Sequence, residues 1–198
     1  MAIPANLVKN HRLKHIDKRP REYLYEHEVE ALIDAAKKTD YSVRNQTLIM
    51  LCYRHGLRST EACNMQWSQI DFENYRIHVN RIKNSDSSVQ PLRDREIVLL
   101  RRLFKERKGD QQFLFMTRFG TKFNNALFNK LMFKLGVDAG LLIPKIHPHM
   151  LRHSTGYKLA NEGFDLRIIQ DYLGHKNINN TVLYTKLSEK KFDSVFRD

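Results

Sequence analysis

The spacing of apolar residues predicts helices in the first third of the chain. After Glu26, apolar residues recur at intervals of three and four, which places them on one face of an α-helix. The same pattern returns before Gly56, a residue type that commonly ends a helix. We therefore expect helices from Glu26 onward, over 42–55, and from about Ser59 through Met65.

The pattern changes to that of β-strands near the middle of the chain. Between Ile70 and Val79, apolar and polar residues alternate, which is typical of a strand with one buried face. A turn is expected at 71–74, and a polar loop at 83–88 leads to another strand at 89–92. These elements predict a short antiparallel sheet.

Helical spacing resumes after Arg93, interrupted by a short strand expected at 113–115. Asp165 is a suitable N-cap, and Gly163 and Gly174 are expected to end helices. The expected fold class is mainly α with a small antiparallel β-sheet (α+β). The predicted helices span 94–107, 123–139, 148–162, 165–173 and 178–187.

The composition is that of a globular domain. The 198 residues are 41% hydrophobic and 28% charged, unlike a disordered chain. No apolar stretch reaches the roughly 20 residues of a membrane-spanning helix. The N-terminus lacks the apolar segment of a signal peptide, so we expect a cytoplasmic protein. Cys52 and Cys63 lie in apolar helical surroundings, and we expect buried thiols rather than a disulfide.

The charge of the chain narrows the class of partner. Thirty-four Lys and Arg residues oppose 22 Asp and Glu residues, for a net charge of +12. Such an excess favours a nucleic acid or another acidic surface. Residues 1–22 are especially basic and show no apolar period, so we interpret them as a basic N-terminal arm preceding a domain at 23–198.

The segment His149-Met-Leu-Arg-His153 contains the most distinctive group of polar residues. Pro148 favours a helix start, so His149 should lie near a helix N-terminus, with Arg152 and His153 on the same face. One guanidinium and two imidazoles at that position suit a phosphate group. A solvent-exposed helix face is the alternative. A metal site is disfavoured, because no carboxylate lies between the two histidines.

Three other features are ambiguous when each is taken alone. Arg58 follows a glycine and precedes Glu61 by three residues, which suits either a surface ion pair or a positioned phosphate ligand. Lys83 lies in a polar loop between two predicted strands. Tyr184 follows the Leu-Gly-His175 segment by nine residues, and a single tyrosine on a helix usually serves packing.

Taken together and in chain order, these residues resemble the tyrosine recombinase (phage integrase) family. The resemblance rests on the strings GLRxxE, HxLRH and LGH and on a tyrosine nine residues beyond the last histidine, and it covers about residues 24 to 190. The short length and the segment ending Gln170-Asp-Tyr-Leu-Gly-His175 look most similar to the Fim-type invertases. The matching residues are Arg58, Lys83, His149, Arg152, His175 and Tyr184.

The resemblance implies DNA strand exchange through a 3′-phosphotyrosine on Tyr184. Arg58 and Arg152 would neutralise the non-bridging oxygens of the phosphate, and His175 would hydrogen-bond one of them. His149 would accept the phenol proton at neutral pH. Lys83 would protonate the departing 5′ oxygen. This chemistry needs no high-energy cofactor, because the phosphotyrosine keeps the energy of the broken bond. It needs no metal, because guanidinium and imidazole groups neutralise the charge.

The resemblance also implies support residues and partners. Glu61, His153 and Asp171 would orient or pack the site. Double-stranded DNA would be the substrate, bound by a homotetramer on two sites with an accessory DNA-bending protein. Phe192, Val195 and Phe196 share a helical face that would pack into a neighbouring protomer. Longer integrases carry an N-terminal core-binding domain that we do not expect here.

Two other functions use the same residues. A DNA-binding regulator of this fold would lack strand transfer, and a type IB-like topoisomerase would relax supercoils as a monomer. The intact set of six residues favours the recombinase. Among recombination reactions, DNA inversion and mobile-element integration or excision remain open from the sequence.

Overall fold

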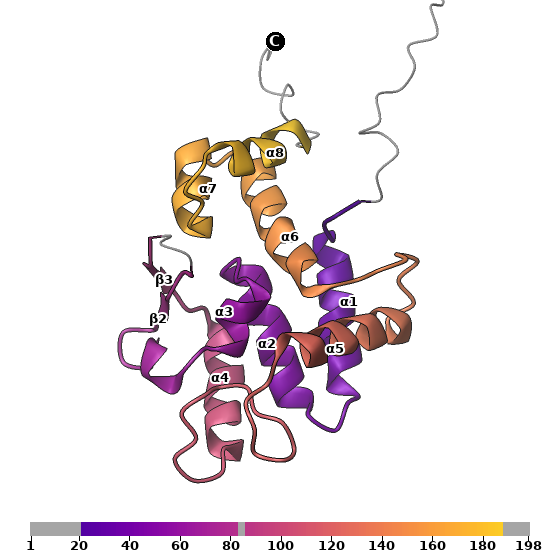
Figure 1. Ribbon diagram of the computed structural model, residues 1–198, viewed down its shortest axis with the longest axis vertical. Coiled ribbons are helices and arrows are strands. Elements are labelled where there is room, and N and C mark those ends of the chain that lie inside the picture. The colour runs from indigo at the N-terminus through magenta and orange to yellow at the C-terminus, as the bar shows by residue number, and fades with distance from the viewer. Residues whose placement is uncertain (1–20, 83–85, 188–198) are drawn as a thin grey trace, which may run out of the picture.

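Helices form most of the structure, and a small sheet lies at one side (Figure 1). The structure is a computed structural model and describes residues 21–82 and 86–187. Lys83, most of the basic arm and the apolar tail residues beyond Leu187 therefore lie outside the described residues. In chain order the elements are α1 (Glu26–Lys37), α2 (Ser42–Arg54), α3 (Ser59–Cys63), η3 (Trp67–Gln69), β1 (Ile70–Asp71), β2 (Arg76–Val79), β3 (Ser88–Pro91), α4 (Asp94–Glu106), α5 (Asn125–Asp138), α6 (Pro148–Asn161), α7 (Leu166–Leu173) and α8 (Asn179–Leu187).

Helix α2 lies at the centre of the main core. It contacts α1, α3, α4 and α6, and nearly all of its side chains from Asn45 to Tyr53 are buried. Cys52 and Cys63 are buried free thiols within this core, as their apolar context predicted. In the described part of the chain, no helix combines the length and the apolar character needed to cross a bilayer.

The sheet is antiparallel, with strand order β1-β2-β3. The carboxylate of Asp71 accepts hydrogen bonds from the backbone N–H groups of Glu73 and Asn74, both at 2.9 Å, which closes the predicted turn. Ile77 and Val79 point into the core, as the alternation predicted. Tyr75 departs from it, because its backbone turns to φ +53° and leaves the ring exposed.

The strand expected at 113–115 does not form. Phe113 makes a single antiparallel bridge with Gln66, and the Leu114 N–H donates to the Met65 carbonyl at 2.9 Å. The chain then turns away, so only one pair of residues bridges here. Leu114 is buried in the core, so its apolar side chain reflects core packing and not a strand.

Helices α6, α7 and α8 form one end of the molecule (Figure 1). Gly163 and Gly174 both adopt left-handed backbone conformations at the predicted helix ends, with φ values of +82° and +64°. The Asp165 carboxylate accepts from the Arg167 N–H at 2.7 Å and caps α7. This arrangement packs Tyr184 of α8 with Ile169 and Leu173 in a second, smaller core.

Candidate active site

Five of the six residues predicted for catalysis line one cavity of about 480 Å³. They come from segments separated by more than 120 positions in the chain, so the fold rather than local sequence brings them together. The sixth, Lys83, lies outside the described residues. The lining consists of Arg58, His149, Arg152, His153, His175, Asn179, Asn180, Leu183 and Tyr184.

Arg58 is held at the N-terminus of α3 by Glu61. Its Nη1 donates to Glu61 Oε1 at 2.6 Å, and its backbone N–H donates to Oε2 at 2.8 Å. The Glu61 side chain is 1% exposed, so this pair differs from the surface ion pair considered from the sequence. Burial alone would raise the pKa of Glu61, but hydrogen bonds from Arg58 and the charge of Arg81 lower it. Glu61 is therefore ionised and fixes the partly exposed Arg58 guanidinium.

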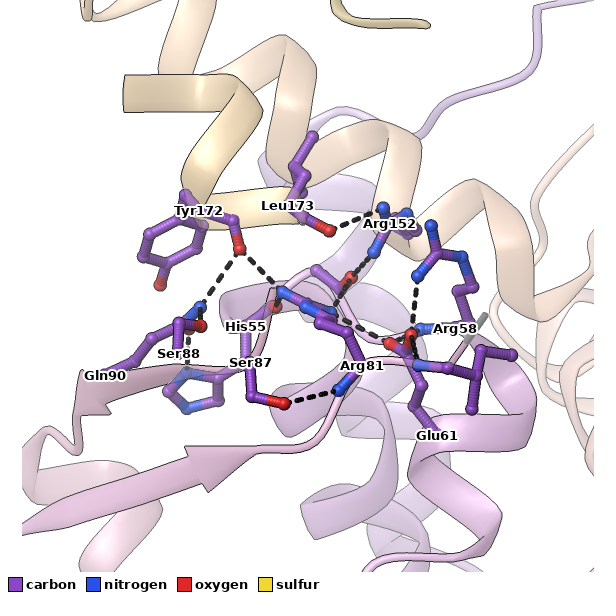
Figure 2. Close-up of polar contacts among 12 residues, drawn as sticks. His55, Arg58, Glu61, Arg81, Ser87, Ser88, Gln90, Arg152, Tyr172 and Leu173 are labelled. Atoms are coloured by element: carbon purple, nitrogen blue, oxygen red, sulfur yellow. Dashed lines mark hydrogen bonds and ion pairs between the residues drawn. The ribbon is translucent and has the colours of Figure 1, made fainter. Parts of the chain in front are cut away.

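Arg152 is buried at the bottom of the cavity. One terminal nitrogen donates to the Gly56 carbonyl, and the other donates to the Leu173 carbonyl at 2.7 Å. Burial, followed by the charges of Arg58 and Arg81, lowers the pKa of Arg152 to about 9. The guanidinium remains charged at neutral pH and is oriented by two backbone carbonyls (Figure 2).

Arg81 is a buried component that the sequence analysis missed. Its Nη1 donates to Glu61 Oε2 at 2.9 Å, so Glu61 serves two arginines (Figure 2). The residue lies two positions before Lys83 and just after β2. An isolated arginine at the end of a strand carries no sequence signal that separates it from an exposed one.

The two histidines of α6 differ in their contact with the tyrosine. His149 lies in the first helical turn at the cavity lining, with its ring centroid 4.4 Å from that of His153. His153 Nδ1 lies 3.0 Å from the Tyr184 hydroxyl. Partial burial and the charge of Arg152 lower the pKa of His149; burial, His149 and Arg152 lower that of His153 to about 4. His153, predicted only as support, thus makes the direct contact with the phenol.

Tyr184 is buried beneath the cavity surface, with 2% of its area exposed. Burial raises the pKa of its phenol to about 12, against the lowering effect of Arg152. The His175 ring lies nearly parallel to the Tyr184 ring, 13° apart in plane and 6.2 Å between centroids. Nδ1 of His175 lies 2.8 Å from Thr181 Oγ1, which fixes the imidazole. Burial and nearby arginines lower the pKa of His175 to about 3, so it is neutral.

Asp171 is the one predicted support residue that the structure does not bring into this site. It is exposed on α7 and lines a separate hollow beside β3. Ile169 and Leu173 occupy the buried face of the same helix. The 100° rotation per residue turns Asp171 away from that face.

The charge and ligand chemistry of the cavity suit an anion rather than a metal ion. Among residues 21–82 and 86–187, no group of three His, Cys, Asp or Glu side chains is placed to hold a metal. Arg58 and Arg152 instead bring two guanidinium groups to one cavity. Guanidinium and imidazole donors beside a buried phenol match the requirements of phosphoryl transfer to tyrosine.

Comparison with known proteins gives a consistent answer. The chain matches the phage integrase family over residues 22–191. It is 37% identical to the type 1 fimbriae regulatory protein FimB of Escherichia coli K12 over 184 residues, covering 91% of this chain and 92% of FimB. It is 38% identical to FimE of the same strain over 181 residues, covering 89% and 91% of the two chains.

Solved structures agree with the sequence relatives. The crystal structure of XerA recombinase superposes with a TM-score of 0.77 at 26% identity, covering 89% of this chain. The chain spans 64% of the length of that structure. The catalytic domain of bacteriophage HP1 integrase shares the fold, with a TM-score of 0.64 at 21% identity. The chain therefore belongs to the phage integrase family and is a site-specific recombinase of the tyrosine type.

Proposed function

We propose that this chain cuts and rejoins DNA strands through a 3′-phosphotyrosyl intermediate on Tyr184. The observation that carries the proposal is the placement of the Tyr184 phenol in the same cavity as Arg58 and Arg152, with its hydroxyl 3.0 Å from His153. A scissile phosphate in this cavity would contact a nucleophile, two guanidinium groups and a hydrogen-bonding imidazole. These are the groups that an attack on a phosphodiester requires.

Arg58 and Arg152 would neutralise the negative charge of the phosphate. Arg58 is partly exposed and fixed by Glu61, so its free N–H groups can reach a non-bridging oxygen. Arg152 is fixed by two carbonyls and would bind from below. His175, held by Thr181, would donate a further hydrogen bond. Because these groups are positioned before substrate arrives, little reorganisation accompanies the growth of negative charge in the transition state.

The phenol needs a base, because its pKa of about 12 keeps it protonated at neutral pH. In the proposed step the Tyr184 oxygen bonds to phosphorus, and the bond from phosphorus to the 5′ oxygen breaks. The phenol proton passes to an imidazole, and Lys83 protonates the 5′ oxygen. His149 is the acceptor that the family resemblance implies, and the contact at 3.0 Å makes His153 the candidate for holding or receiving the proton. Attack by another 5′ hydroxyl reverses the step without a cofactor.

Double-stranded DNA is the proposed partner. The net charge of +12 suits a phosphate backbone, and XerH recombinase, 26% identical to this chain, has been solved bound to its difH substrate. We further propose a tetramer on two DNA sites, an accessory DNA-bending protein and action on cytoplasmic, nucleoid-associated DNA. A chain truncated after Ser188 should fail to assemble a two-site complex in native gels; normal assembly would contradict the role given to the tail.

DNA inversion is the favoured biological reaction. The FimB and FimE relatives match this chain over nearly their whole length and carry names that place them in the regulation of type 1 fimbriae. An invertible regulatory segment, and thus phase variation, is consistent with such a role. Integration or excision of a mobile element uses the same strand chemistry with differently arranged sites. Inverted repeats beside the gene would favour the first reaction, and an attachment site would favour the second.

Tyr184→Phe tests the chemical proposal. On a nicked half-site drawn from repeats beside the gene, the unchanged protein should form a covalent protein–DNA adduct, and Tyr184→Phe should form none while still binding DNA. Tyr75→Phe, at an exposed tyrosine of the sheet, is the matched control and should react normally. An adduct that survives Tyr184→Phe would overturn the proposal. DNA binding without any adduct would favour a regulator, and relaxation of plasmids by a monomer would favour a topoisomerase.

A further inference from the structure

Arg81 is enclosed between three segments that each hold part of the candidate active site. Its side chain is 0% exposed. It lies where the α2–α3 turn, α3 and the C-terminal end of α7 meet (Figure 2). We propose that Arg81 is a positioning residue that fixes Arg58 and Arg152 relative to each other for phosphate binding. This proposal rests on the proposed recombinase function.

The guanidinium of Arg81 uses both terminal nitrogens to join these segments. Nη1 donates to the Gly56 carbonyl at 3.1 Å and to Glu61 at 2.9 Å. Nη2 donates to the His55 carbonyl at 3.0 Å and to the Tyr172 carbonyl at 2.6 Å. The four acceptors surround a planar fork, which a lysine ammonium on a single stem cannot reproduce.

Glu61 transmits the position of Arg81 to Arg58. Arg81 and the Arg58 backbone N–H share Oε2, while the Arg58 guanidinium holds Oε1 at 2.6 Å. The Ile82 N–H also approaches Oε1 at 3.4 Å. Removing Arg81 would leave the buried carboxylate with one charged partner and free it to rotate. Arg58 would then lose the fixed anchor that aims its free N–H groups at the cavity.

Arg81 and Arg152 bind neighbouring backbone carbonyls, and one of these carbonyls accepts from both. Both donate to the Gly56 carbonyl. Arg81 binds the Tyr172 carbonyl at the end of α7, and Arg152 binds the next carbonyl, that of Leu173. The two cations therefore sit at the negative end of the α7 dipole. The Tyr172 and Leu173 carbonyls that they bind lie just before Gly174 and His175 in the chain.

Gly174 shows how closely the Arg81 stem packs against this turn. A Cβ added at Gly174 would lie 2.9 Å from Arg81 Cγ and 3.1 Å from its Cδ. Gly174 also has a φ of +64°, which favours glycine. The turn that precedes His175 is thus shaped around Arg81, so movement of one would displace the other.

The test compares two substrates that differ in charge at the scissile phosphorus. A methylphosphonate replaces one charged non-bridging oxygen with a methyl group, so the reaction needs less help from arginine. On the ordinary phosphodiester, Arg81→Gln and Arg81→Lys should form adduct about 10²-fold more slowly, as expected for misplaced catalytic groups. On the methylphosphonate this deficit should shrink at least about tenfold, as it should for Arg58→Ala. A fold defect would slow both substrates equally.

Arg95→Gln is the matched control, because it removes one arginine from an exposed ion pair with Glu30. It should leave both rates unchanged. Equal deficits on both substrates, unchanged rates in the Arg81 variants, or loss of folding in both Arg81 variants would overturn the positioning role. Failure of the unchanged protein to form a Tyr184 adduct would instead count against the proposed function itself. The two proposals therefore fail in distinguishable ways.

Discussion

The ring of Tyr184 lies directly against the backbone of Gly156. A Cβ added at Gly156 would lie 2.5 Å from two carbons of the ring and 2.7 Å from a third. Such contacts are too close for any side chain, so α6 accommodates the tyrosine only because this position is glycine. With its ring against Gly156, Tyr184 places its hydroxyl 3.0 Å from His153, which lies three residues before Gly156 on α6.

Gly156→Ala should displace Tyr184 and slow adduct formation about 10²-fold, since misplacement of a reacting group by about 1 Å has an effect of that size. DNA binding should persist, because the substituted residue is buried behind the cavity. Single-turnover cleavage and a binding assay on the same half-site measure the two effects.

Gly136→Ala provides the control for added volume on a helix. A Cβ there would lie 2.6 Å from Ile146 Cδ1, nearly as close as the contact at Gly156, but on α5 and against a flexible side chain. Because the end of the Ile146 side chain can shift, this variant should fold and keep its cleavage rate. Equal rates for Gly156→Ala and Gly136→Ala in folded protein would contradict the role given to Gly156.

Arg152→Lys should lower both stability and activity although the charge is retained. A lysine cannot bind the Gly56 and Leu173 carbonyls together. The Gly56 carbonyl keeps Arg81 as a donor, so the expected loss comes from the buried Leu173 carbonyl and is about 1–3 kcal/mol of unfolding free energy. Urea unfolding measures that loss. Adduct formation should fall by about 10²-fold or more. Lys158→Arg, on the exposed part of the same helix, should change neither quantity.

The histidines of the cavity should make the DNA-free protein lose stability as the pH falls from 6.5 to 5. The pKa values of His153 and His175, about 4 and about 3, lie below the ordinary value, so the unfolded chain binds more protons in this range. By linkage, stability therefore rises with pH there, by at most about 1.4 kcal/mol per unit for each histidine and less where solvent screens it.

Thermal unfolding across this pH range tests the titration. His153→Gln and His175→Gln should each flatten the dependence, while His78→Gln, at an exposed position on β2, should leave it unchanged. The range lies above the ordinary pKa of carboxylates, so their protonation contributes little to it. An unchanged slope in the His153→Gln and His175→Gln double variant would contradict this explanation.

His55 and Glu96 form a buried pair that should be needed for stability. His55 Nε2 lies 2.7 Å from Glu96 Oε1, and its Nδ1 lies 2.8 Å from Gln90 Oε1. Glu96→Ala should cost about 1–3 kcal/mol of unfolding free energy, because the buried His55 imidazole loses its hydrogen-bond partner. Glu30→Ala, which breaks an exposed pair, should cost no more than about 1 kcal/mol. Comparable losses in the two variants, measured by urea unfolding, would refute the difference.

Much of the fold and site was predictable because the decisive signals are local. Glycines at 163 and 174 end helices through their own backbone preference, and HxLRH places its residues on one face by helical periodicity alone. The family resemblance identifies five residues that line the cavity, because its motifs are short and lie at fixed places in the chain. Tyr75 and the segment around Phe113 were predicted less well, because their conformation depends on a turn and on core packing.

The residues and contacts that the sequence did not predict involve distant partners. Arg81 meets Tyr172 across 91 positions, and His153 meets Tyr184 across 31. His55 joins Gln90 and Glu96 across more than 30 positions. No spacing rule connects such residues. Their roles follow only from the three-dimensional arrangement.

The single carboxylate of Glu61 faces Arg58 and Arg81, and Arg152 lies beyond it, so within the described residues this group keeps an excess of two positive charges. A bound phosphodiester would serve as their missing counterion. Folding stability and substrate recognition are then parts of one electrostatic balance: the protein tolerates mutual repulsion among its arginines until DNA relieves it. DNA should accordingly raise the melting temperature by more than its backbone contacts elsewhere on the surface would provide.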